Sequence, residues 1–212
     1  MKKAQVLQLY SLVERKRQSH DPRIAFRIKS LLSKEQALVL LTASLSDDIE
    51  AVKTSVDQYL PEWKELLRVT YLEVAEDFYN FQAALFNKKA FNLAKLVQNI
   101  TTAVESRAKS IVQTTKKMID FMYNKAKTKS EFLALLENSY NFNKAGVMAK
   151  TEVNTAANLG MELAAEEHGA ETKTWITRRD ERVREAHIAI DGQKRPINDP
   201  YSNGLQYPGD PA

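Results

Sequence analysis

The chain has 212 residues, no cysteine and a formal net charge of +4 at pH 7. That length is enough to bury a hydrophobic core, and the lack of cysteine excludes disulfides, thiolate nucleophiles and cysteine-based zinc sites within these residues. No apolar run approaches the roughly 20 residues that a membrane-spanning helix needs, so we expect a soluble protein without a membrane partner.

Helix breakers are concentrated towards the C-terminal end of the chain. There are six glycines and six prolines, and most of them follow residue 190. The first 170 residues are therefore expected to be largely helical. We predict a mainly α fold, with a multi-helix elongated body over residues 1–140 and a small C-terminal α+β module over residues 141–212.

The body begins with segments of helical periodicity. Apolar positions at helical spacing predict one helix over residues 2–18 and another over residues 22–44. Asp21 and Pro22 predict a break between them, because Asp can cap a helix whose first residue is Pro.

A third helix is predicted to begin after Ser46 or Asp47, either of which can cap its N-terminus, and to end near residue 60. The following helix begins at Glu62 and carries a regular apolar stripe, which we interpret as a core-facing surface. The stripe consists of Trp63, Leu67, Thr70, Val74, Phe78, Phe81 and Leu85.

The next helical stretch combines an apolar stripe with lysines that point elsewhere, namely Lys109, Lys116 and Lys117. A solvated face is the simplest interpretation of these lysines, and contact with DNA or an acidic protein surface is the functional alternative. Residues 35–87 are strongly acidic and residues 88–150 strongly basic, which favours segments that bind each other or complementary partners. The apolar stripe consists of Ala108, Ile111, Val112, Thr115, Ile119 and Met122.

Ser130 is predicted to cap a short helix, and the helix after it should run for about 25 residues to a C-terminal cap at Gly169. Small residues along its stripe predict close helix packing, and Glu152 lies on the same stripe. A buried carboxylate is costly unless it is paired. We therefore predict that Glu152 pairs with Arg184 or, failing that, with Arg182.

After Gly169 the helical period is lost. Residues 171–178 alternate and are rich in β-branched side chains, which predicts a strand, and residues 193–197 can return as a second strand. Between them, Asp180 is expected to cap a helix of about two and a half turns. Asp191 and Gly192 are expected to close that helix or to form a tight turn.

Four polar residues of this module, Asp180, Arg184, His187 and Asp191, are spaced to share one face of a continuous helix. Such a set is compatible with acid–base chemistry or with a divalent metal ion. It is also compatible with a structural cluster in which Asp180 caps the helix and pairs with Arg184 while the ring of His187 packs. Since no nucleophile and no glycine-rich phosphate loop accompany the set, we expect no catalytic residue, no metal site and no cofactor.

The order of these elements resembles the phage head morphogenesis family, the minor head proteins similar to the F protein of phage Mu. The resemblance covers about residues 140–212, and the Cys-Arg-Cys segment that usually follows in the family is missing. The matching residues are Thr151 and Glu152, Trp175 and Thr177, Asp180, Arg182, Arg184 and His187, Asp191 and Gly192, and Pro208 to Pro211.

The resemblance implies a phage minor head protein, made in the host cytoplasm and located in the procapsid or virion. It would act in head assembly near the portal vertex, with portal or capsid proteins as partners and packaged double-stranded DNA as a further contact. The alternative is a DNA-contacting protein of the packaged genome or ejection apparatus, which the basic segment over residues 88–150 favours. A metal-dependent enzyme is the third hypothesis.

Overall fold

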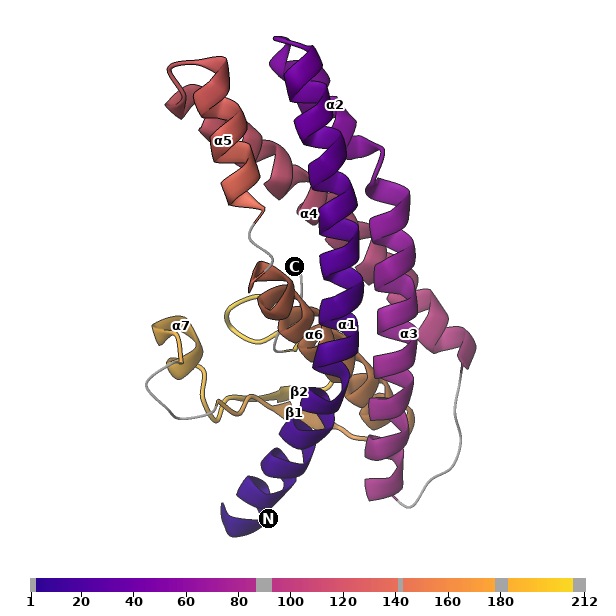
Figure 1. Cartoon of the computed structure of the whole chain (residues 1–212). Helices are drawn as coiled ribbons and strands as arrows, with labels where there is room; N and C mark the ends of the chain where they lie inside the picture. The colour runs from indigo at the N-terminus through magenta and orange to yellow at the C-terminus, as the bar shows by residue number, and fades with distance from the viewer. Residues whose placement is uncertain (1–2, 87–92, 141–142, 178–182, 208–212) are drawn as a thin grey trace. The chain divides into compact units, whose positions relative to one another are not determined.

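The chain folds mainly into α-helices and carries one short two-stranded sheet (Figure 1). The computed structural model describes residues 3–86, 93–140, 143–177 and 183–207. Within those ranges both strands follow Gly169, so the predicted mainly α fold and the predicted position of the strands are confirmed.

Seven helices and two strands lie in the described residues. Strands β1 and β2 pair in antiparallel register, with Lys173 opposite Arg195. The elements are α1 (Lys3–Leu45), α2 (Ile49–Asp57), α3 (Leu60–Leu85), α4 (Leu93–Lys125), α5 (Lys129–Ser139), α6 (Asn143–Glu167), β1 (Thr172–Thr174), α7 (Glu185–Ile188) and β2 (Lys194–Pro196).

The chain forms two compact units, each made from two separate stretches of sequence. Unit 1 comprises Met1–Thr70 and Thr101–Lys150, and unit 2 comprises Tyr71–Ile100 and Thr151–Ala212. The long helices α3, α4 and α6 each contribute residues to both units. The division at residue 140 rests on motifs and stays a prediction.

Helix α1 is continuous, so the predicted break at Asp21 and Pro22 is wrong. A proline removes the hydrogen bond to the carbonyl four residues earlier, which here belongs to Gln18. Pro22 and Gln18 are both exposed, so water can satisfy that carbonyl. The helix is maintained by burial of its apolar stripe, which includes Ile24, Ile28, Leu31, Val39 and Ala43.

Two helices begin at caps that differ from the predicted ones. The Asp48 Oδ1 atom accepts a hydrogen bond of 2.9 Å from the Glu50 amide at the start of α2. Thr128 Oγ1 accepts one of 3.2 Å from the Glu131 amide at the start of α5. Both cap residues have the extended backbone that an N-cap requires. The predicted caps at Ser46, Asp47 and Ser130 are therefore wrong.

The predicted C-terminal cap of α6 is confirmed. Gly169 has a φ of +80°, and the amide of Ala170 donates a 2.9 Å hydrogen bond to the Ala165 carbonyl. This pairing is the Schellman motif, which favours glycine because the left-handed conformation excludes most side chains.

The predicted core stripes of α3 and α4 are largely confirmed. Trp63, Leu67, Thr70, Val74 and Phe78 of α3 are buried, and so are all six predicted stripe residues of α4. Towards the end of α3 the stripe is wrong, because Phe81 is half-buried and Leu85 is exposed.

Helix α6 packs closely against α3 within unit 2, as its small residues predict. Ala156 and Ala157 are fully buried. At Gly160 the contact is so close that an added Cβ atom would overlap the backbone carbonyl group of Ala75. Only glycine fits this point of contact.

We therefore predict that Gly160→Ala destabilises the protein by about 1–3 kcal/mol or more, because two backbones must separate to admit one methyl group. Gly146 lies on the same helix and has no atom near the corresponding position, so Gly146→Ala is the matched control. It should be neutral or stabilise by up to about 1 kcal/mol, since alanine favours helix. Denaturant unfolding followed by circular dichroism measures both, and equal effects would contradict the contact.

Candidate functional site

Trp175 is the centre of a small core in the C-terminal part of unit 2. Its side chain is buried, and its ring contacts two others edge-on, with centroid distances of 5.0 Å to Tyr201 and 5.4 Å to His187. Ile190 and Leu205 pack against the same core. The motif tryptophan and histidine are thus brought together, and the histidine contributes a packed ring.

Asp191 and Gly192 close the loop between the strands. The Asp191 Oδ1 atom accepts a 2.8 Å hydrogen bond from the Thr177 amide. The Gly192 amide donates a 2.8 Å bond to the Trp175 carbonyl, at a φ of +82° that favours glycine. The motif Asp-Gly pair therefore has a structural role, which is to fix the loop against the segment that carries Trp175.

An ion pair that the sequence reasoning missed joins this module to α6. Lys173 Nζ lies 2.6 Å from a Glu162 carboxylate oxygen and 2.7 Å from the Gln206 side-chain oxygen. The same ammonium group lies 5.4 Å from the ring centroid of Tyr201. Burial, with the nearby Glu162 carboxylate, raises the pKa of Tyr201 to about 12. The sequence could have indicated that Lys173 takes part in this contact, because the alternation of side chains along a strand places Lys173 on the same side as Trp175.

The predicted helix after Asp180 is shorter than expected. Helix α7 covers only Glu185–Ile188, and Arg184 precedes it in an extended conformation without a side-chain cap hydrogen bond. Arg184, His187 and Asp191 therefore do not share one helical face, because Asp191 is drawn into the turn that binds Thr177. The predictions for Asp180, Arg182 and Pro208 to Pro211 lie outside the described residues.

Glu152 is fully buried, as its place on the apolar stripe predicts. Its Oε2 atom accepts a 2.9 Å hydrogen bond from the Tyr71 hydroxyl of α3. Arg184 is exposed, and among the described residues it forms no ion pair with Glu152, so that predicted pair is wrong. The Tyr71 hydroxyl is thus one partner of the buried carboxyl group. The alternative pair with Arg182 stays a prediction, because Arg182 lies outside the described residues.

A second buried glutamate, Glu35 of α1, was missed by the sequence reasoning. Its Oε2 atom accepts a 2.7 Å hydrogen bond from the Trp63 indole, and its Oε1 atom accepts one of 3.3 Å from the Tyr140 hydroxyl. Glu35 lies between Leu31 and Val39 on the apolar stripe of α1. A glutamate on an apolar stripe is the feature that identified Glu152 in the sequence, and Glu35 shows the same feature.

Burial raises the pKa of the Glu35 carboxyl above its ordinary value of 4.5. Hydrogen bonds from Trp63, Tyr140 and Thr115 favour the ionised form and offset part of that increase. The pKa of the Tyr140 hydroxyl is raised as well, by burial and by the adjacent Glu35. This cluster joins α1, α3, α4 and the end of α5 within unit 1.

Two of the three lysines predicted to contact DNA or a partner are paired within the molecule. Lys116 lies 2.7 Å from an Asp57 carboxylate oxygen, and Lys109 lies 3.2 Å from Glu105. Lys117 is exposed. The pair between Lys116 and Asp57 joins the basic segment over residues 88–150 to the acidic segment over residues 35–87. Contact between these two segments is what their opposite charges predict.

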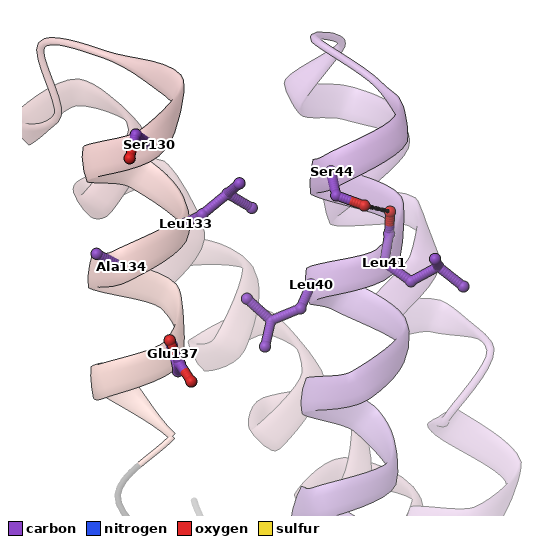
Figure 2. A pocket seen from close by; sticks show the side chains of 7 residues that line it. All are labelled: Leu40, Leu41, Ser44, Ser130, Leu133, Ala134 and Glu137. Atoms are coloured by element: carbon purple, nitrogen blue, oxygen red, sulfur yellow. Dashed lines mark hydrogen bonds between the residues drawn. The ribbon is translucent and has the colours of Figure 1, made fainter.

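The end of α1 and helix α5 border a groove in unit 1 (Figure 2). Leu40 and Leu133 point towards each other across it, whereas Leu41 points away from α5. The Ser44 hydroxyl donates a 2.7 Å hydrogen bond to the Leu41 carbonyl and is thus engaged by its own helix. Small and apolar side chains make up most of this lining, which presents no evident set of reacting groups.

Three observations bear on ligands and relatives. Within the part of the chain that the structure describes, no three His, Cys, Asp or Glu side chains gather in a way that would hold a metal ion. None of its helices combines the length and apolarity needed to cross a membrane. The chain matches no protein-family model, no curated protein and no solved structure.

We predict that Asp191→Ala loosens the C-terminal module, because the Thr177 amide loses its acceptor, at a cost of about 1–2 kcal/mol. Asp191→Asn should cost less, since its amide oxygen can still accept. Hydrogen exchange at the amides of Thr177 and Gly192 measures the opening. The control is Asp199→Ala, which removes only an exposed carboxylate 3.8 Å from Arg195. Equal exchange in the Asp191 and Asp199 variants would contradict the role of Asp191.

We also predict that Glu35 makes stability depend on pH. Its folded pKa is raised, so the folded protein binds the proton more tightly than the unfolded chain. This contribution is complete below pH 4.5 and is lost as the pH rises through the folded pKa, by up to about 1.4 kcal/mol per pH unit.

Glu35→Gln removes that titration, so the stability of this variant relative to the parent should increase as the pH rises above 4.5. Glu76→Gln, which changes an exposed glutamate, is the control and should leave the pH profile unchanged. Urea unfolding at a series of pH values tests the difference. Parallel profiles for the parent and Glu35→Gln would contradict it.

Proposed function

We propose that the chain is a minor head protein of a bacteriophage, a structural component of the procapsid or virion that acts in head assembly near the portal vertex. Its partners would be portal or capsid proteins. The proposal rests on the order of motif residues in the last third of the sequence, which resembles the head morphogenesis family.

One observation supports a structural role over catalysis most directly. Trp175, His187, Asp191 and Gly192 are each used in packing or in closing the module, by ring contacts or by hydrogen bonds to backbone. A catalytic group has to remain available to a substrate. Side chains whose polar atoms and rings maintain a loop serve better to present a docking surface.

The exposed side chains around this core are the candidates for that surface. Arg184, Glu185, Ile188 and Lys194 are exposed beside the buried Trp175 core, and they combine both charges with one apolar group. Mixed charge around an apolar contact is suited to recognition of another protein. The module would thus be a rigid adaptor that holds the chain at its binding position in the head.

The prediction is that the chain is present in purified phage heads and that its incorporation depends on the module. Trp175→Ala removes the centre of the core and should abolish incorporation, whereas Ile176→Ala changes an adjacent residue that is 42% exposed and should not. A phage genome with the gene deleted, complemented by each variant, allows heads to be isolated and the chain quantified by immunoblot. A chain that is absent from heads contradicts the proposal.

The same heads separate the main proposal from the DNA-contacting alternative. If portal or shell proteins bind the chain, it should remain in procapsids that have not packaged DNA. If packaged DNA holds it, the chain should be found only in full heads. In the structure Lys109 and Lys116 are already paired with carboxylates of the chain, which makes the first result the expected one.

A further inference from the structure

An apolar groove lies between α1 and α3 in unit 1. Phe26 and Leu31 of α1 and Leu66 and Val69 of α3 supply its apolar lining. Leu31 is buried, whereas Phe26 is 73% exposed. The exposed Phe26 and the half-buried Leu66 and Val69 together form an apolar strip that another molecule can cover.

The two edges of the groove carry opposite charges. Lys34 lies on the α1 edge, and Glu62 and Glu65 lie on the α3 edge. Glu65 binds Arg68 of its own helix. Lys34 and Glu62 are exposed, and neither forms an ion pair within the described residues. Each edge therefore offers one charge that the chain itself leaves uncompensated.

The two free charges lie at the same level along the helices. The hydrogen bond between Trp63 and Glu35 fixes the register, and Glu62 and Lys34 are their immediate neighbours in sequence. In unit 1, α3 runs back alongside α1 (Figure 1). At 1.5 Å per residue, Phe26 lies about 12 Å from the level of Lys34, and Val69 about 10 Å from that of Glu62. Phe26 and Val69 therefore share the other end of the groove.

We propose that this groove binds a second copy of the chain, about a two-fold axis parallel to α1 and α3. Rotation about that axis places α1 of each copy against α3 of the other and preserves the levels along the helices. Lys34 then meets Glu62 of the second copy, twice by symmetry. Phe26 meets the apolar end of the facing groove, beside Val69.

Charge complementarity favours this arrangement over a dimer whose two-fold axis runs across the helices. An axis across the helices would place α1 against α1 and α3 against α3. The α3 edges, each with the uncompensated charge of Glu62, would then face each other, and like charges across an interface are costly. The proposal is independent of the proposed phage function, because all of its residues lie in unit 1, whereas the C-terminal motifs belong to unit 2.

The test is a charge-reversal experiment on the full chain, read by analytical ultracentrifugation. The parent should show a concentration-dependent monomer–dimer equilibrium. Lys34→Glu sets acid against acid, Glu62→Lys sets base against base, and each should raise the dimer dissociation constant about tenfold or more. An equimolar mixture of the two variants should restore the dimer, because both heterodimer contacts then join opposite charges. The double variant Lys34→Glu, Glu62→Lys should also dimerise.

Lys117→Glu and Glu76→Lys are matched controls, since they reverse exposed charges that do not line the groove, and they should leave the dissociation constant unchanged. Far-UV circular dichroism checks that every variant remains helical. Phe26→Ser should weaken the dimer as well. A parent that remains monomeric at its highest soluble concentration overturns the proposal and leaves the groove to a different protein. Single variants that do not complement each other in the mixture overturn it too.

Discussion

Hydrogen bonds from aromatic side chains of α3 to glutamate carboxyl groups hold the interior together. Trp63 donates to Glu35 in unit 1, and Tyr71 donates to Glu152 in unit 2. Both glutamates are fully buried, and a buried carboxyl group without donors costs several kcal/mol. Tyr79 of the same helix donates to the half-buried Glu167. Each bond fixes the register of a neighbouring helix against α3, which apolar packing alone specifies less strictly.

The C-terminal module repeats this principle on a smaller scale. Its apolar core is small, so polar contacts define it: Asp191 binds the Thr177 amide, and Lys173 joins the module to Glu162 of α6. Residues used in this way are held in place and give the surface around them a defined shape. That is the property that the proposed assembly role would require, and it is compatible with the proposed contact between copies through the uncompensated charges on unit 1.

The helical content, the core stripes of α3 and α4, the Gly169 cap and the burial of Glu152 could be predicted from the sequence, because they depend on local periodicity and on glycine. The continuity of α1 through Pro22 could not, since burial of distant apolar residues outweighs the lost hydrogen bond. The partners of Glu152 and Glu35 were also beyond reach. They come from residues 81 and 28 positions away, and one sequence does not show which helix faces which.

A double-mutant cycle on Tyr71 and Glu152 tests this role of α3 most directly. Tyr71→Phe removes the donor, Glu152→Met replaces the acceptor with an apolar group of similar size, and denaturant unfolding gives the free energy of each variant and of the double variant. We predict a coupling energy of about 1–3 kcal/mol, because a single change leaves one buried polar group without this partner and the double change does not. Strictly additive effects would contradict the claim that this bond holds unit 2 together.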